Sequence, residues 1–90
     1  MQLNALTAIS PVDGRYRSRT AHLAPFFSEW GLMRYRVRVE VEYFLHLSEI
    51  PLPQLAPFKA ADAQTLRRIY AEFSEADAER IKAFERTTNH

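Results

Sequence analysis

The uninterrupted segment Ser28–Ser48 limits most strongly what this chain can fold into, and two periodicities compete in it. From Met33 to Tyr43 apolar residues occupy the odd positions and charged residues the even ones. That alternation, rich in valine, is typical of a β-strand. The same segment also has apolar residues at spacings of three and four, which fall on one face of a helix: Trp30, Met33, Val37, Val41, Phe44, and Leu47 or Ser48.

The length of Ser28–Ser48 favours the helix. A typical strand has about five or six residues, whereas this segment has 21 residues with no proline and with glycine only at Gly31. No second strand follows it across a tight turn. We therefore predict a helix, on which the alternation leaves Tyr35, Val39 and Tyr43 for a second contact surface. A helix that is apolar on more than one face is expected to be buried from more than one side, which indicates a further protein surface.

Prolines divide the rest of the chain. Gln2–Ile9 alternates weakly, so we predict an extended arm there, and a short helix over Ser18–Leu23 that is interrupted at Pro25. The proline-rich stretch Ile50–Pro57 is predicted to be a non-helical loop, which three apolar side chains pin to the core: Leu52, Leu55 and Phe58.

Two further helices are predicted after this loop. The first covers Lys59–Phe73, with one apolar face: Ala63, Leu66, Ile69, Tyr70 and Phe73. Ser74 and Asp77 have the spacing of a capping box, so the next helix begins at Glu75. It is expected to bury Ala78, Ile81, and Phe84 or Glu85. The predicted fold class is all-α, with residues 1–90 as one small helical domain.

Composition excludes several classes of protein. The apolar fraction of 47% is that of a globular chain. The net charge of +1 predicts no strong attraction to nucleic acid or to an anionic membrane. The absence of cysteine removes disulfides and thiolate metal sites and fits a cytoplasmic location. We see no signal peptide, and no apolar run approaches the roughly 20 residues of a membrane span.

The loop Ser10–Tyr16 is the least helix-like part of the chain. Pro11 restricts the backbone, and Asp13-Gly14 is a turn signal because glycine tolerates a positive φ. Arg15 and Tyr16 follow this bend, and arginine presents a two-pronged donor to phosphate or carboxylate groups. The alternative is an ordinary surface arginine beside a half-buried tyrosine.

The segment Thr87–His90 is the second candidate site. Its two threonines, Asn89 and His90 bring hydroxyl, amide and imidazole groups together after the third helix. Such groups are suited to ligand hydrogen bonds. A frayed polar terminus is the alternative.

Four segments of the chain together resemble one known family: Ser10-Pro-Val-Asp-Gly-Arg-Tyr16, Phe27-Ser-Glu-Trp-Gly-Leu32, Arg36-Val-Arg-Val-Glu-Val41 and Glu85-Arg-Thr-Thr-Asn-His90. They closely resemble the N-terminal region of the adenylosuccinate lyases, in the longer bacterial form, within the fumarase/aspartase superfamily. The order and the spacing are similar across nearly all 90 residues. The region Leu52–Tyr70 is the least distinctive part.

The resemblance implies an all-α enzyme that forms a homotetramer around a long helical bundle. The family eliminates fumarate from adenylosuccinate, which gives AMP, and from the succinylated aminoimidazole carboxamide ribotide, both in purine biosynthesis. Carried onto this chain, Arg15 and Tyr16 would bind the nucleotide, with its phosphate as their target. Asn89 and His90 would begin the family's Asn-His-Asp substrate loop. No metal and no cofactor is implied.

The family's catalytic residues fall outside this sequence. Its general acid is a histidine and its general base a serine, and both would lie beyond residue 90, as would the central bundle and the C-terminal domain. β-Elimination needs both groups held in place. We therefore expect residues 1–90 alone to be inactive and to supply substrate contacts to a longer chain.

Two other classes of function fit parts of the sequence less well. A non-enzymatic helical interaction module would explain the broad apolar coverage of Ser28–Ser48, because exposed apolar surface marks a partner site. Nucleic-acid binding is disfavoured, since the arginines of that helix are offset by nearby glutamates. His22 and His46 have no further ligand at metal-binding spacing and are expected to be packed or on the surface.

Overall fold

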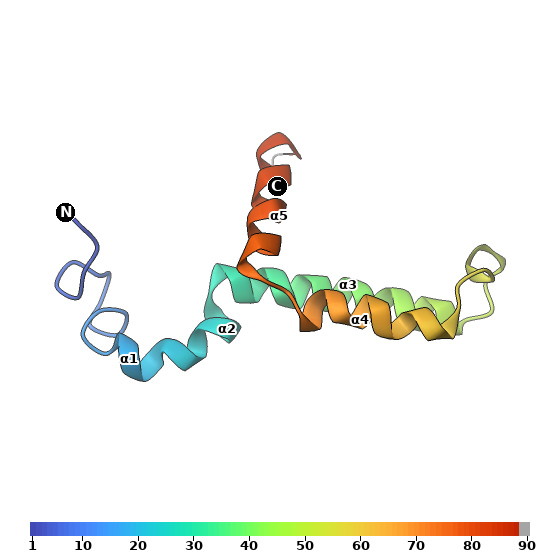
Figure 1. The fold of residues 1–90 in the computed structure, drawn as a ribbon, viewed down its shortest axis with the longest axis horizontal. Coiled ribbons are helices and arrows are strands. Elements are labelled where there is room, and N and C mark those ends of the chain that lie inside the picture. The colour runs from blue at the N-terminus through green and yellow to red at the C-terminus, as the bar shows by residue number, and fades with distance from the viewer. Residues whose placement is uncertain (89–90) are drawn as a thin grey trace. The chain divides into compact units, whose positions relative to one another are not determined.

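The computed structural model describes residues 1–88 of the 90, and every regular element within them is helical (Figure 1). These residues divide into two compact units, Met1–Gly31 and the part from Leu32 onward, and each unit is described by itself. The predicted all-α fold class is confirmed.

Turns, and not an extended arm, occupy the start of the first unit. The side-chain oxygen of Asn4 accepts hydrogen bonds from the backbone N–H groups of Leu6 at 2.9 Å and Thr7 at 3.2 Å. The N–H of Ala8 donates to the carbonyl of Asn4 at 2.9 Å. Asparagine favours such a turn because its side chain bonds to its own backbone two residues on. The prediction of an extended Gln2–Ile9 was therefore wrong.

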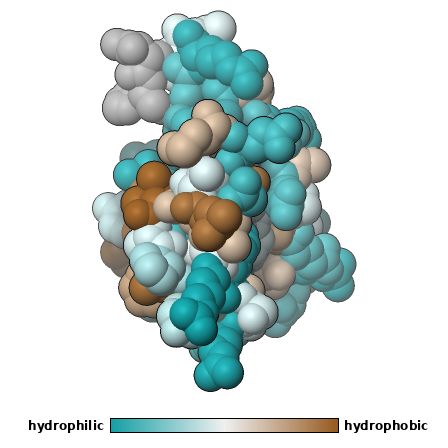
Figure 2. Space-filling model, turned by 90° about the vertical axis from the view of Figure 1, so that its left-hand side faces the viewer, coloured by the Kyte–Doolittle hydropathy of each residue, from teal (hydrophilic) through white to brown (hydrophobic). Residues whose placement is uncertain are grey.

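Short helical pieces follow in the first unit. Helix α1 is Arg17–Thr20, a 3₁₀ turn spans Ala21–Leu23, and helix α2 is Ala24–Phe27. Pro25 does not interrupt this run, contrary to the prediction, because it lies in the first turn of α2, where its missing N–H is not needed. Many apolar side chains of this unit are exposed. Figure 2 shows one face of the molecule, on which hydrophobic groups lie among hydrophilic ones.

Helix α3 is Glu29–Glu49, which confirms the helix predicted over Ser28–Ser48. Ser28 is extended and its Oγ accepts the N–H of Gly31 at 3.0 Å, as an N-cap does. A Cβ on Gly31 would lie 2.5 Å from the carbonyl oxygen of Pro25. Glycine is therefore required here by the close approach of α2 to the first turn of α3.

The core of the second unit lies between α3 and the antiparallel helix α4, Ala63–Ala71 (Figure 1). The buried apolar side chains are Met33, Val41, Leu45 and Phe73. Leu45 was not among the predicted core residues. Phe44, which was, lies half-buried with its ring edge-on to that of Phe58, at 5.1 Å between centroids.

Three arginines connect α3 with α4. Arg67 donates through Nε to Oε2 of Glu42 at 3.2 Å, and Arg34 donates through Nε to the carbonyl of Tyr70 at 3.0 Å. The guanidinium of Arg38 lies over the Tyr70 ring, 5.7 Å from its centroid. These contacts hold the two helices in register along their length.

The connection between α3 and α4 contains two 3₁₀ turns, Pro53–Leu55 and Ala60–Asp62. The prediction that Ile50–Pro57 is wholly non-helical was therefore wrong. Pro53 can begin a 3₁₀ turn because its missing N–H is not needed at that position. Phe58 packs as predicted, but Leu52 is exposed. Ile69 of α4, which was predicted to be in the core, is also exposed, at 50%.

Helix α5, Glu75–Thr88, begins with the predicted capping box. The N–H of Ser74 donates to Oδ2 of Asp77 at 3.0 Å, and the N–H of Asp77 donates to Oγ of Ser74 at 3.1 Å. Ala78, Ile81 and Glu85 are half-buried, whereas Phe84 is 67% exposed. Of the two predicted alternatives, Glu85 is therefore the more buried residue.

The capping box predicts a loss of α5 in acid. The hydrogen bond from the Ser74 backbone, and secondly that from its side chain, lower the pKa of Asp77 below its ordinary value of 3.8. A carboxyl whose pKa is lower in the folded state stabilises the fold above the unfolded pKa, and this contribution disappears as the pH falls through the folded pKa. Circular dichroism between about pH 6 and about pH 2 should show an acid loss of helicity that is smaller in Asp77→Ala. An equal loss in both proteins would contradict the prediction.

A second apolar stripe runs along the outer side of α3. Val39 is 66% and Tyr43 64% exposed, and Leu32, about two helical turns before Val39, is exposed as well. Tyr35, the third residue predicted for this surface, is half-buried. The predicted second apolar face is thus present on the surface of the second unit.

Candidate functional site

A capping box forms the first turn of the loop Ser10–Tyr16. The N–H of Ser10 donates to Oδ1 of Asp13 at 2.8 Å, and the N–H of Val12 donates to Oγ of Ser10 at 3.0 Å. Pro11 follows the cap residue, where proline is favoured. The N–H of Gly14 donates to the carbonyl of Ser10 at 3.0 Å and closes the turn. The hydrogen bond from Ser10 is the main reason that the pKa of Asp13 is lowered, and the charge of Arg17 adds to it.

The second half of the loop is attached to helix α1. The N–H of Tyr16 donates to the carbonyl of Pro11 at 2.8 Å, which bends the chain back over the first turn. The hydroxyl of Thr20, at the end of α1, donates to the carbonyl of Val12 at 3.1 Å across eight residues of sequence. Side chains on both sides of Gly14 therefore fix the loop.

Gly14 is required by close packing. A Cβ at this position would lie 2.5 Å from the carbonyl oxygen of Ala5 and 3.1 Å from the Cβ of Ala8. Its φ lies outside the left-handed region, so the predicted reason for glycine here, a positive φ, was wrong. The Asn4 turn lies directly against the loop, and only the absence of a side chain permits that contact.

Arg15 and Tyr16 lie together on the rim of a hollow of about 470 Å³ in the first unit. The Arg15 guanidinium is 5.3 Å from the centroid of the Tyr16 ring, within the range of a cation–π contact. Both side chains are exposed, Tyr16 at 43%. The rest of the hollow is lined by Ala5, Leu6, Ala8, Ile9, Ser10 and Pro11. An exposed arginine beside a phenol and an otherwise largely apolar lining is suited to a ligand with an anionic group.

The other predicted site residues, Asn89 and His90, lie outside the described residues. The threonines before them are described. The hydroxyls of Thr87 and Thr88 donate to the carbonyl of Phe84 at 2.9 and 3.1 Å. Both threonine hydroxyls therefore donate within α5, although the hydroxyl oxygens can still accept a hydrogen bond from a ligand.

Two residues that hold the candidate site were missed by the sequence analysis. Asp13 was interpreted only as part of a turn, although Ser10 and Asp13 have the same spacing as the capping box at Ser74 and Asp77. That spacing could have identified it. Thr20 has no comparable signal, because its bond to Val12 depends on how α1 folds back on the loop.

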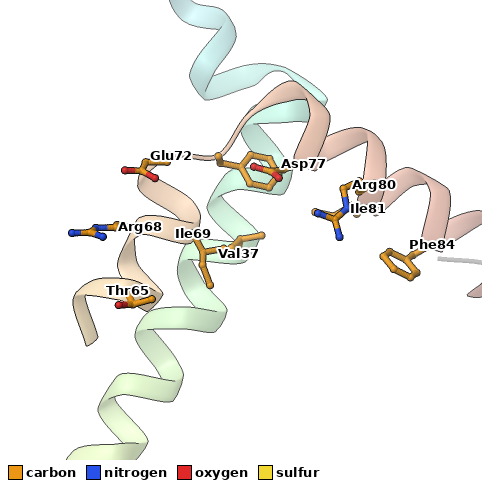
Figure 3. Close-up of a pocket in the computed structure, with 10 residues that line it drawn as sticks. Val37, Thr65, Arg68, Ile69, Glu72, Asp77, Arg80, Ile81 and Phe84 are labelled. Carbon is orange, nitrogen blue, oxygen red and sulfur yellow. The ribbon is translucent and has the colours of Figure 1, made fainter. Parts of the chain in front are cut away.

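A groove in the second unit, of about 490 Å³, lies among helices α3, α4 and α5 (Figure 3). Val37 and Ile69 lie at its centre, with Ile81 and Phe84 on the α5 side. The charged residues at its edges are of both signs: Arg68, Glu72, Asp77 and Arg80. This balanced edge does not favour a ligand of either charge.

Within residues 1–88, no cluster of three or more histidine, aspartate or glutamate side chains is arranged to hold a metal ion. No helix in the same range is long and apolar enough to cross a membrane.

Comparison with known proteins relates the whole chain to one enzyme. It is 51% identical over 94 residues to the adenylosuccinate lyase of Dictyostelium discoideum. It is 50% identical over 91 residues to the adenylosuccinate lyases of Vibrio cholerae and Escherichia coli K12. Each match covers 100% of this chain and 20% of the relative, so the chain spans about a fifth of the length of these relatives, at their N-terminal end. No family model matches the chain.

Proposed function

Residues 1–90 belong to the adenylosuccinate lyase family, and we propose that they are the N-terminal segment of a lyase that eliminates fumarate from adenylosuccinate and from the succinylated aminoimidazole carboxamide ribotide. The proposed enzyme is a cytoplasmic homotetramer of purine biosynthesis, and AMP is the product of the first reaction. The observation that carries this proposal is the match of the whole chain, at 40–51% identity, to proteins of that name.

The proposed role of the loop Ser10–Tyr16 is to bind the phosphate of the nucleotide. Arg15 supplies a fixed positive charge and a fork of N–H donors, and Tyr16 supplies a hydroxyl beside it. Their joint position on the rim of the hollow supports this assignment. Asn89 and His90 are proposed to begin the family's Asn-His-Asp substrate loop.

The proposed reaction is a β-elimination. A base removes the proton from the carbon beside a carboxylate, the C–N bond breaks, and an acid gives a proton to the leaving nitrogen. The proposed acid and base are the histidine and the serine of the family, both beyond residue 90. The part of residues 1–90 is to hold the substrate in the geometry that those groups require, which converts binding energy into rate.

Replacing Arg15 tests the assignment. In the intact enzyme that carries this sequence, Arg15→Ala is expected to lower kcat/KM for fumarate release about thirtyfold. A charge-assisted hydrogen bond contributes about 2 kcal/mol to binding, and about 1.4 kcal/mol corresponds to a factor of ten. Arg15→Lys should recover part of the loss, because lysine keeps the charge without the fork.

Arg19→Ala is the matched control, since Arg19 is an exposed arginine on the neighbouring helix α1. If the parent enzyme is active and Arg15→Ala behaves like Arg19→Ala, the proposed lyase function stands, but the assignment of Arg15 to substrate binding is wrong. An intact protein without lyase activity on either substrate would overturn the proposed function.

A helical interaction module is the second candidate function, and the exposed stripe on α3 favours it. Val39 and Tyr43 present apolar surface that a partner protein could cover. The two functions are compatible, because the rest of the same enzyme could be that partner. A folded intact protein that binds another protein but has no lyase activity would favour the interaction module.

A further inference from the structure

We propose that Asp13 and Thr20 are positioning residues, which hold Arg15 and Tyr16 in the orientation that receives an anionic group of the substrate. Neither residue lines the hollow. Asp13, before the two recognition residues, binds the backbone of Ser10, and Thr20, after them, binds the backbone of Val12. This inference rests on the proposed function of the loop and adds to it the residues that make the loop rigid.

Asp13 fixes the start of the loop. Its carboxylate accepts the N–H of Ser10 at 2.8 Å, in a bond that is partly shielded from water. The carboxylate is ionised at neutral pH, as an ordinary aspartate is, and therefore acts there only as an acceptor. Its bond to the N–H of Ser10 is the main cause of its lowered pKa. Without this acceptor the first turn keeps only the bonds of Ser10 to Val12 and Gly14.

Thr20 fixes the loop to α1. Its hydroxyl can donate only one hydrogen bond at a time, and the shortest contact, 3.1 Å, is to the carbonyl of Val12. The alternatives are the carbonyls of Tyr16 and Arg17, at 3.3 and 3.4 Å, which are local to its own helix. The bond to Val12 is the one that crosses the loop.

The two hydrogen bonds restrain the short segment that carries Arg15 and Tyr16, and this restraint affects substrate binding. Arg15 and Tyr16 lie between Asp13 and Thr20 in sequence, and Gly14 is packed against Ala5 with no room for a Cβ. Movement of the backbone therefore turns the guanidinium and the phenol together. Two-pronged recognition of an anion needs side chains held to within about half an ångström, so a looser loop weakens binding.

Two pairs of variants of the intact enzyme test the proposal. Thr20→Val removes the hydroxyl and keeps the shape, whereas Thr20→Ser keeps the hydroxyl. Asp13→Ala removes the acceptor, whereas Asp13→Asn keeps an acceptor oxygen. We expect Thr20→Val and Asp13→Ala to raise KM for adenylosuccinate about fivefold with little change in kcat, because a single hydrogen bond of about 1 kcal/mol is lost. The serine and asparagine variants should recover most of the affinity.

The decisive measurement repeats Thr20→Val and Asp13→Ala in a background without the recognition groups, Arg15→Ala/Tyr16→Phe. A residue that acts through them has little left to disturb there, so the fivefold effect should disappear. Persistence of the full effect in that background, or equal losses in the conservative variants, would overturn the positioning role. If the background itself binds substrate normally, the proposed phosphate site fails as well. If the background is impaired but Thr20→Val and Asp13→Ala are normal, only the positioning role fails.

Discussion

Gly14→Ala is expected to lower kcat/KM for fumarate elimination about a hundredfold in the intact enzyme, more than the loss of Arg15 alone. The added Cβ would lie 2.5 Å from the carbonyl oxygen of Ala5, which is backbone and cannot rotate away. Relief requires the loop to move away from the Asn4 turn, which displaces Arg15 and Tyr16 together. A displacement of about 1 Å in a group that positions substrate can cost a factor of about a hundred.

Ser18→Ala is the control for Gly14→Ala, because it adds no atoms and changes an exposed residue of α1. Circular dichroism should be unchanged in both variants, since the long helices belong to the second unit. Activity of Gly14→Ala within about threefold of the parent would show that the loop can shift without cost, against the argument from rigidity.

Leu45→Ala is expected to lower the free energy of unfolding by about 3 kcal/mol, within the usual range for a buried leucine. Leu45 is only 5% exposed and lies in the small core between α3 and α4, where few other side chains can fill the space. Urea unfolding followed by circular dichroism measures the change. In so small a unit this loss is a large share of the total stability.

Val39→Ala is the matched control for Leu45→Ala, because it shortens an apolar side chain on the same helix that is 66% exposed. Its effect on residues 1–90 is expected to stay within about 0.5 kcal/mol. A loss of similar size for both variants would mean that the core does not lie on the face that Leu45 occupies.

The sequence predicts the long helices well because their signals are local. The length and the three-and-four spacing of Ser28–Ser48 outweighed a strand-like alternation, and helix α3 covers Glu29–Glu49. The Ser74–Asp77 capping box marked the first residue of α5 correctly. In both cases the determining contacts lie within a few residues of each other.

Predictions that depended on contacts across the chain succeeded less often. Leu45 was not assigned to the core and Ile69 was, because helical spacing alone does not decide which edge of a broad apolar face a neighbour covers. Pro25 was taken as a break, although its place in the first turn of α2 costs nothing.

The candidate loop shows the same division. Its bend and the neighbouring Arg15 and Tyr16 were apparent from residue types. The reason for glycine at position 14 was not apparent. It is the close approach of the Ala5 carbonyl, nine positions earlier, and no local sequence pattern indicates that contact.

The contact between Ala5 and Gly14 also has a practical consequence for handling the protein. The first residues of the chain form one wall of the hollow beside Arg15, with Ala5, Leu6 and Ala8 among its lining. An affinity tag or a fluorescent label fused ahead of Met1 would therefore be placed next to the candidate ligand site. For assays of substrate binding, purification handles belong at the other end of the polypeptide.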